Sequence, residues 1–235
     1  MYAKKSLGQH FLQSKDIAKT LVDAGEIKKG ERVVEIGPGR GILTDALLIT
    51  GARVEAVEKD HELTLHLKDL FETEMQKKNL KVVEADILHF KPGAKPYKLI
   101  ANIPYYITGE ILRKFLSTEN QPTLMVLMVQ KEVAMRIAKE KKGSLLSVSV
   151  KVYGTPQIVR VVLPGSFNPP PKIESAILRV SGISKLFFTS AKINERDFFE
   201  LLRLGFGQKR KQLASNLRKF KIKDEHSLPK ERFEE

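Results

Sequence analysis

Nine residues decide the fold of this chain: Val33-Val34-Glu35-Ile36-Gly37-Pro38-Gly39-Arg40-Gly41. The first four are typical of a short buried strand, and the glycines after them allow a tight turn and a close approach of the backbone to a ligand. Apolar residues then recur with helical spacing at Ile42, Leu43, Ala46 and Leu47. A strand, a glycine turn and a helix in this order predict an α/β fold that binds a ligand at the turn.

The spacing of the glycines favours one class of ligand. They follow the pattern G-x-G-x-G, whereas the dinucleotide fingerprint G-x-G-x-x-G needs a small residue where Ile42 stands. A pyrophosphate is therefore the weaker hypothesis. The better one is S-adenosylmethionine, a nucleoside that carries an amino-acid tail.

Polar side chains end the next three predicted strands. Glu58, Asp86 and Asn102 each come directly after a run of mostly hydrophobic residues. Ligands of open α/β sheets bind beyond the carboxyl ends of the strands, where Glu58 is placed to accept hydrogen bonds from a ribose diol and Asp86 from an adenine amino group. Either acid alone is more often a solvated loop residue, but their shared position favours a binding site.

The tetrapeptide Asn102-Ile103-Pro104-Tyr105 is typical of enzymes that methylate an exocyclic amino group. Such a nitrogen is conjugated into its base, so it needs hydrogen-bond acceptors and a flat surface rather than a strong base. We expect the Asn102 side chain and the Ile103 carbonyl to accept its N–H bonds, and Tyr105 to stack on the ring. Pro104 fixes φ and stiffens the turn. The plain alternative is a strand followed by a proline turn.

With these motifs in place, the chain resembles the rRNA adenine dimethyltransferases over residues 4–220. The resemblance rests on five segments in family order: Ser6–Leu12, Glu35–Gly41, Asn102–Tyr105, Phe167–Ser175 and Phe206–Leu213. Ile103 stands where family members usually carry Leu or Ile. Within the family, the first and fourth segments look most like the small-subunit enzymes.

The resemblance implies a Rossmann-like class I S-adenosylmethionine-dependent methyltransferase fold. We expect a mostly parallel seven-stranded sheet in a catalytic domain over residues 1–180, and a small basic helical domain over residues 181–235. The chain ends where members commonly carry one more helix, so this second domain is expected to be small. The implied reaction places two methyl groups on N6 of each of two adjacent adenosines in small-subunit (16S) rRNA, within the pre-ribosomal small subunit.

The resemblance also assigns residues to roles. The implied target base leaves its stack and is held between Tyr105 and Phe167, and the run Pro169–Pro171 predicts that Phe167 stands on a rigid rim rather than in a packed element. The catalytic set is therefore Asn102, Ile103, Pro104, Tyr105 and Phe167. The implied cofactor-binding set is Gln9, His10, Leu12, Gly37, Gly39, Glu58, Lys59, Asp86, Ile87 and Asn102.

The charge of the chain is uneven. The net charge is +13, and nine Lys or Arg residues lie between residues 196 and 223. A run of charge is usually a solvated helix face, but apolar neighbours here favour a surface that follows RNA phosphates. Lys4 with Lys5, and Lys139 with Lys141 and Lys142, are weaker candidates. The predicted RNA-binding residues are Arg203, Lys209, Arg210, Lys211, Arg218 and Lys219.

Composition excludes several classes of function. The chain has no cysteine, which excludes disulfides, cysteine-ligated metals and chemistry that needs a thiol nucleophile. The histidines lack a metal-binding spacing, so we expect no metal site. No apolar run approaches the roughly 18 residues of a membrane span, and no segment resembles a signal peptide. We therefore expect the protein to be cytoplasmic, and we also expect a monomer.

Several segments have less certain structures. Residues 15–24 are typical of an amphipathic helix, and residues 157–163 and 175–180 of two closing strands. Residues 147–153 alternate like a strand, but the resemblance implies a helix. Residues 181–193 are expected to be a linker, with a helical pattern from Glu195 onward.

Three other functions stay open. The first is the large-subunit rRNA methyltransferase that confers macrolide resistance. The second is a DNA adenine methyltransferase, which Ile103 disfavours because that group usually has proline there. The third is a ribosome-assembly or transcription factor that keeps the fold without the activity, against which Glu58, Asp86 and Asn102 argue.

Overall fold

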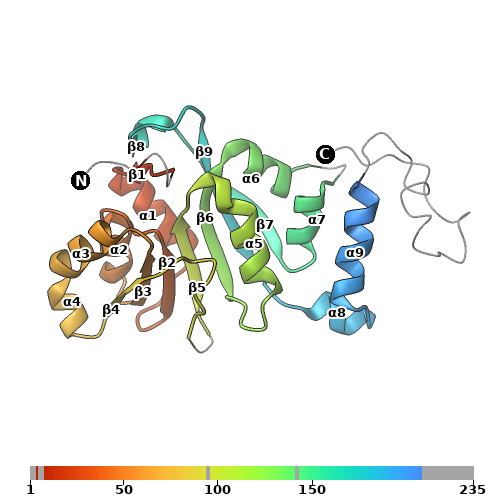
Figure 1. Cartoon of the computed structure of the whole chain (residues 1–235), viewed down its shortest axis with the longest axis horizontal. Coiled ribbons are helices and arrows are strands. Elements are labelled where there is room, and N and C mark those ends of the chain that lie inside the picture. Colours follow the sequence, from red (N-terminus) through yellow and green to blue (C-terminus); the bar gives the residue numbers. More distant parts are fainter. Residues whose placement is uncertain (1–3, 5–7, 94–95, 141–142, 208–235) are drawn as a thin grey trace, which may run out of the picture.

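The computed structural model describes residues 4, 8–93, 96–140 and 143–207 (Figure 1). A seven-stranded sheet forms its centre, in the order β4-β3-β2-β5-β6-β9-β7, and β1 pairs separately with β8. The strands are β1 Phe11–Leu12, β2 Arg32–Ile36, β3 Arg53–Glu58, β4 Leu80–Glu84, β5 Lys98–Asn102, β6 Leu124–Gln130, β7 Thr155–Val162, β8 Phe167–Asn168 and β9 Ser175–Ser181. The helices are α1 Lys15–Ala24, α2 Ile42–Ile49, α3 His61–Leu70, α4 Glu72–Gln76, α5 Thr108–Ser117, α6 Lys131–Ala138, α7 Leu145–Lys151, α8 Leu186–Ala191 and α9 Glu195–Phe206, with 3-10 turns η2 Tyr105–Ile107 and η3 Pro164–Ser166.

The sheet is mostly parallel, as the resemblance implied. Strands β2 to β6 pair in parallel, and β9 pairs antiparallel with both β6 and β7. Strand β2 lies between β3 and β5, so the order of the strands reverses at this point. Open α/β sheets bind ligands in the crevice beyond such a reversal, which places the glycine turn after β2 at the expected binding edge.

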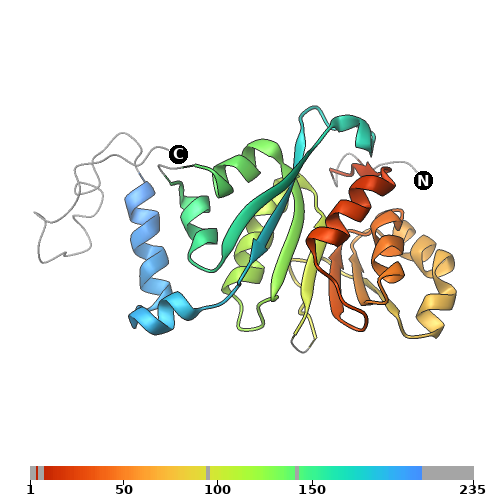
Figure 2. The same cartoon turned by 180° about the vertical axis from the view of Figure 1, so that it is seen from behind.

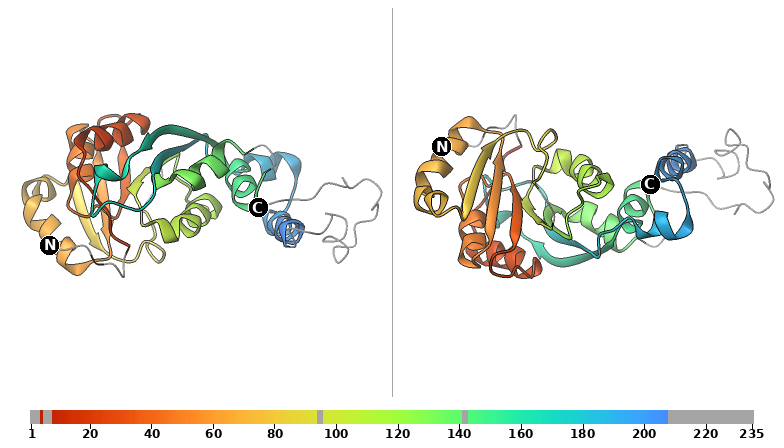
Figure 3. Two further views of the ribbon diagram at one scale, coloured as in Figure 1. Left: turned by 90° about the horizontal axis from the view of Figure 1, so that it is seen from above. Right: turned by 90° about the horizontal axis from the view of Figure 1, so that it is seen from below.

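Helices cover both faces of the sheet (Figures 2 and 3). In β6, Leu124, Val126 and Met128 belong to the apolar cluster under α1 and α2, while the residues between them belong to the cluster under α5, α6 and α7. Burial on both faces explains why this strand is a continuous apolar run rather than an alternating pattern.

Local signals fix two helices that hold the sheet. Ser14 caps α1 by accepting a hydrogen bond from Ile17 N–H, and the helix spans residues 15–24 as predicted. Ser144 caps α7 in the same way, accepting from Ser147 N–H at 3.2 Å. Residues 147–151 of the alternating pattern are therefore helical, as the resemblance implied, and within α7 the buried residues are Ser147 and Val150.

Helices α8 and α9 lie at the opposite end of the molecule from α3 and α4 (Figure 1). Residues 186–191 form α8, so the prediction of a linker over 181–193 is wrong for this stretch. The cause is apolar contact: Phe188 is buried and packs against Tyr153 and Phe198. The helical prediction from Glu195 is confirmed up to Phe206. The division into domains after residue 180 stays a prediction.

Candidate functional site

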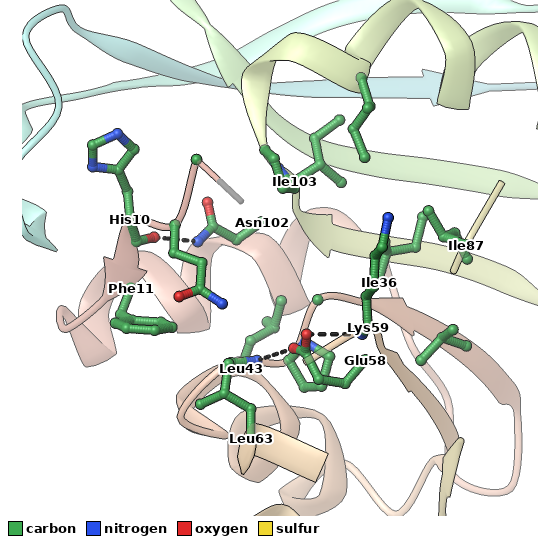
Figure 4. Close-up of a pocket in the computed structure, with 18 of the residues that line it drawn as sticks. His10, Phe11, Ile36, Leu43, Glu58, Lys59, Leu63, Ile87, Asn102 and Ile103 are labelled. Atoms are coloured by element: carbon green, nitrogen blue, oxygen red, sulfur yellow. Dashed lines mark hydrogen bonds between the residues drawn. The ribbon is translucent and has the colours of Figure 1, made fainter. Parts of the chain in front are cut away.

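A pocket of about 280 Å³ opens beyond the carboxyl ends of β2, β3 and β5 (Figure 4). The turn after β2 brings its backbone to this pocket because Gly37 and Gly39 have positive φ of 61° and 58°. Every residue predicted to bind the cofactor lines the pocket, as do Ile103, Pro104 and Tyr105.

Glu58, at the end of β3, is buried and held by backbone donors. Its Oε1 accepts from Lys59 N–H (2.9 Å) and Asp60 N–H (3.0 Å), and its Oε2 accepts from Gly39 N–H (3.2 Å). Burial raises the pKa of Glu58 above its usual value, and the three backbone donors oppose that shift. A carboxylate has about four acceptor positions, so Oε2 can still accept a hydrogen bond from one ligand hydroxyl. The sequence had predicted that Glu58 accepts from both hydroxyls of a ribose diol.

Asp86 carries a counter-ion of its own. Its Oδ2 accepts from Lys59 Nζ at 2.8 Å and its Oδ1 from Leu88 N–H at 2.9 Å. The hydrogen bond from Lys59 is the main reason why the pKa of Asp86 lies below its usual value. Lys59 therefore lies against the acid that the sequence assigned to the adenine amino group.

The amide of Asn102 is oriented by the chain itself. Its Nδ2 donates to the backbone carbonyl of His10 at 3.1 Å, as the dashed line in Figure 4 shows. Among the described residues Oδ1 has no partner, so it is available to accept an N–H bond from a substrate amine. Nearby, the Tyr105 hydroxyl bonds to Ser175 Oγ. Burial raises the pKa of Tyr105 above its usual value, and the hydrogen bond with Ser175 opposes that shift.

Phe167 is the one predicted catalytic residue that does not line the pocket. It is 3% exposed, lies in β8 opposite Leu12 of β1, and packs in the cluster that contains Ile177 and Val162. The prediction that it stands on a rigid rim rather than in a packed element is therefore wrong. The pairing of β1 with β8 brings two segments 155 residues apart together and buries the ring (167 − 12 = 155).

Asp60 was not among the predicted site residues, although its side chain binds two residues near the N-terminus, Lys4 and Gln9, beside the pocket. Its carboxylate accepts from Lys4 Nζ at 3.0 Å and from Gln9 Nε2 at 3.2 Å, and it also caps α3. Burial raises the pKa of Asp60, but the bonds from Lys4 and Gln9 outweigh it and leave the pKa below its usual value. The position of Asp60 just before a helix predicts that it caps the helix. Its bonds to Lys4 and Gln9 cannot be predicted from the sequence, because those residues are distant along the chain.

Glu35 lies under the glycine turn and does not line the pocket. It is fully buried, accepts from Thr44 Oγ1 at 2.7 Å through Oε2, and has no partner for Oε1 among the described residues. Burial raises the pKa of Glu35 to about 8, and the nearby charge of Glu58 adds to the shift. At neutral pH this carboxyl is therefore largely protonated.

The pocket fits S-adenosylmethionine on its own chemistry. Glu58 offers a carboxylate oxygen for a ribose hydroxyl, and Leu63 and Ile87 supply apolar walls for a flat base. A Cβ at Gly39 would lie 3.0 Å from the Phe11 ring, so only glycine leaves this backbone as close to the pocket as it is. A nucleoside with a polar tail matches this combination of acceptor, apolar wall and exposed backbone.

Comparison with known proteins identifies the family. A family model for the ribosomal RNA adenine dimethylases matches residues 1–234. The chain belongs to this family. It is thus an S-adenosylmethionine-dependent rRNA adenine methyltransferase, as the motifs predicted, and its fold is that of the class I methyltransferases.

Individual relatives agree with this assignment. Ribosomal RNA small subunit methyltransferase A of Dehalococcoides mccartyi is 42% identical, with 92% of this chain and 74% of the relative covered. The Thermosynechococcus vestitus protein of the same name is 37% identical, with 92% and 82% covered. Among solved structures, a Plasmodium falciparum dimethyladenosine transferase has a TM-score of 0.78 at 32% identity, covering 88% of this chain and 74% of that one. The 23S rRNA methyltransferase ErmE has a TM-score of 0.73 at 25% identity, covering 89% and 84%.

The methyltransferase has a second hollow, the α9 groove, defined as the cleft of about 860 Å³ between α5, α7 and α9. Among the described residues, Arg113, Arg196 and Arg203 line the α9 groove without a carboxylate partner, whereas Lys185 pairs with Glu119 and Glu195. Arg203 was predicted to bind RNA. The other predicted RNA-binding residues, Lys209, Arg210, Lys211, Arg218 and Lys219, lie outside the described residues.

No helix in the described part of the methyltransferase is both long enough and apolar enough to cross a membrane. Nor do the described residues contain a group of three or more side chains that would hold a metal ion.

Proposed function

We propose that this chain methylates small-subunit rRNA, adding two methyl groups to N6 of each of two adjacent adenosines. The observation that carries the chemistry is the amide of Asn102: its Nδ2 is bound to the His10 carbonyl, so its Oδ1 is directed by the fold rather than by the substrate. The choice of the small subunit is supported by relatives of that name at up to 42% identity, against 25% for ErmE.

The residues act by positioning. When bound, S-adenosylmethionine supplies a methyl group activated by its sulfonium. Asn102 Oδ1 and the Ile103 carbonyl accept the N–H bonds of the amine and hold its lone pair toward the pocket, and Tyr105 supports the base from one side. Fixed acceptors of this kind need no reorganisation during the reaction. The side chain of Ile103 is buried, which fixes the carbonyl beside Asn102.

The cofactor roles follow the same geometry. We assign Glu58 to the ribose through Oε2, and the glycine turn at Gly37 and Gly39 to the amino-acid tail. Asp86 and Ile87 contact the adenine, with Lys59 as the counter-ion of Asp86. Gln9 and Leu12 position the segment that closes the pocket.

We also propose that the α9 groove contacts RNA phosphates through Arg113, Arg196 and Arg203, since each lacks a carboxylate partner among the described residues. The proposed partner is the pre-ribosomal small subunit, and the proposed form is a monomer that works in the cytoplasm.

A single experiment tests the proposed reaction. Small subunits that lack dimethyladenosine are incubated with the protein and methyl-labelled S-adenosylmethionine, and the rRNA is digested and analysed by mass spectrometry. We expect label in two adjacent adenosines of the small-subunit RNA. Label in large-subunit RNA instead would support the macrolide-resistance alternative, and cofactor binding without transfer to any RNA would support a non-catalytic factor.

A further inference from the structure

The α9 groove carries apolar side chains as well as arginines. Leu145 and Leu146 of α7 and Phe199 of α9 line the groove and are partly exposed. Contacts with RNA phosphates need only cations, so this apolar lining is a feature that phosphate docking does not explain. The groove volume of about 860 Å³ lies within the range of about 300–1,000 Å³ that is typical of sites for small organic ligands.

One side of α9 places an aromatic ring between two cations. Arg196, Phe199 and Arg203 all line the groove, and their spacings of three and four residues put them on the same side of the helix. The two arginines are exposed and lie two helical turns apart, about 10.5 Å along the axis. Arg113 of α5 adds a third exposed cation to the groove.

The ring of Phe199 is held in place before any ligand binds. It stacks on Tyr153, with the planes 20° from parallel and the centroids 5.9 Å apart, and it meets Phe198 edge-on at 5.2 Å. Its backbone carbonyl also accepts a hydrogen bond from Arg203 Nε at 3.1 Å. Because the ring and its neighbouring cation are already positioned, a ligand in the groove has little side-chain ordering to compensate.

The acids and hydroxyls of the groove are already engaged within the protein. Lys185 forms ion pairs with Glu119 and Glu195, so neither acid faces a ligand unpaired. The Tyr153 hydroxyl donates to Glu195, and the Ser149 hydroxyl donates to the Leu145 carbonyl at 2.6 Å. The groove therefore favours an anionic chain with flat apolar groups, and these hydroxyl hydrogens are not free to read the identity of a base.

We propose that the α9 groove seats one unpaired nucleotide of the rRNA, separate from the target adenosines. Its base packs against Leu146 and Phe199, and the three arginines hold the phosphates on either side. A single strand presents unstacked bases to apolar and aromatic side chains, whereas a duplex hides the faces of its bases. The inference rests on the proposed function and deepens it, because phosphate contacts alone would not distinguish a single strand from a duplex.

Two substitutions change the lining without changing the charge. Gly109 of α5 lines the groove, and a Cβ there would meet no atom within 4 Å, so Gly109→Leu narrows the groove without a clash. Leucine also favours the helix more than glycine does. Phe199→Leu keeps an apolar side chain but removes the flat ring.

Two further variants complete the set. Arg196→Ala removes one cation and leaves the lining intact. Gly165→Leu is the matched control for Gly109→Leu, because a Cβ at Gly165 would also meet no atom within 4 Å and this glycine lines neither the groove nor the pocket.

The readout is the affinity for a short unstructured single-stranded RNA and for a duplex of the same length, measured by fluorescence anisotropy at several salt concentrations. We expect Gly109→Leu and Phe199→Leu to weaken single-strand binding about tenfold, the loss of one stacked base, and to leave duplex binding within about twofold. Their salt dependence should match that of the unmodified enzyme.

Arg196→Ala should weaken binding of both RNAs and lower the slope of log affinity against log salt by roughly 0.7–0.9. Gly165→Leu should bind both RNAs as the unmodified enzyme does. S-adenosylmethionine affinity within about twofold in all four variants would show that each is folded.

Two results would overturn the assignment. One is equal loss, or no loss, of single-strand and duplex binding in Gly109→Leu and Phe199→Leu, which would leave the groove as a phosphate surface only. The other is an acidic amphipathic peptide of Glu and Leu that binds more tightly than the single strand and is lost in Gly109→Leu, which would assign the groove to a protein helix. Failure of the proposed function is distinct, because the unmodified enzyme would then transfer no methyl groups to small-subunit RNA, a quantity that these binding measurements do not involve.

Discussion

The pocket beyond the strand ends and the α9 groove are both rich in charge, but their charges are held in opposite ways. In the pocket, Glu58 is bonded to three backbone N–H groups and Asp86 to Lys59. In the α9 groove, Arg113, Arg196 and Arg203 have no carboxylate partner among the described residues. Charges that are already held suit a ligand with fixed atomic positions, whereas unpaired arginines suit a flexible polyanion.

This contrast predicts how the two regions respond to mutation. Changes in the pocket should act on one step, cofactor binding or turnover, and should depend on geometry rather than on salt. Changes in the α9 groove should act on RNA affinity alone and should depend strongly on salt.

Asn102→Ala should have the largest effect. It removes the fixed acceptor for the substrate amine, and we expect kcat to fall more than 100-fold, which corresponds to about 2.7 kcal/mol. RNA affinity should change little, because one amide contributes little to holding a polyanion. Single-turnover methylation and an RNA-binding titration measure the two quantities on the same protein. Turnover within tenfold of the unmodified enzyme would exclude the role assigned to Asn102.

Glu58→Gln should mainly weaken S-adenosylmethionine binding. Hydrogen bonds to a charged group contribute about 1.5–3 kcal/mol, so we expect affinity to fall roughly 10- to 100-fold by calorimetry. Part of this loss comes from the bond that Glu58 makes to Gly39 N–H, because the glycine turn relaxes without it. Glu62→Gln, on the exposed start of α3, is the control. Unchanged affinity would remove Glu58 from the cofactor site.

Arg113→Ala combined with Arg203→Ala should test the α9 groove. Each side chain that neutralises a phosphate contributes roughly 0.7–0.9 to the slope of log affinity against log salt, so we expect the slope to decrease by about one to two units, with unchanged cofactor affinity. The control is Arg53→Ala combined with Arg160→Ala, which removes the same charge elsewhere; Arg160 pairs with Asp16. Equal slopes for the two double variants would show that the groove does not dock RNA.

Local sequence was enough to locate the pocket, because each polar residue there directly follows its own strand. Glu58, Asp86 and Asn102 meet at one edge for the general reason that parallel strands end together. The errors have another origin. Phe167 was misplaced because its burial depends on pairing with Leu12, and Asp60 was missed because its partners Lys4 and Gln9 are 56 and 51 residues away.

The alternating pattern of residues 147–153 shows the same limit. A period of two predicts a strand, but the cap at Ser144 and the small buried face of α7 decide for a helix. Helix α8 forms in the expected linker because Phe188 finds an aromatic cluster built by residues on other elements. Contacts between distant segments carry no signal in one sequence.

The smallest predicted effect concerns Glu35, an acid buried behind the pocket lining. Among the described residues, its Oε1 has no hydrogen-bond donor, in contrast to the carboxylate of Glu58. The folded-state pKa of Glu35, about 8, lies above the usual 4.5, so the folded protein binds more protons than the unfolded chain between these values. Stability from this group is present at low pH and is lost as the pH rises toward 8. The maximal slope is about 1.4 kcal/mol per pH unit.

Glu35→Gln removes this titration while keeping an oxygen for Thr44 Oγ1. Any constant cost of the new amide cancels when each protein is compared with itself at two pH values. Between pH 6.5 and 7.5 we expect the Tm of the unmodified protein to fall about 2–4 °C further than that of the variant, since about 1 kcal/mol shifts the Tm of a chain of this size by that amount. Thermal melts of both proteins without cofactor measure this difference. Parallel pH profiles would mean that Glu35 is ionised in the folded protein. The bond to Thr44 alone would not explain how the buried charge is then stabilised.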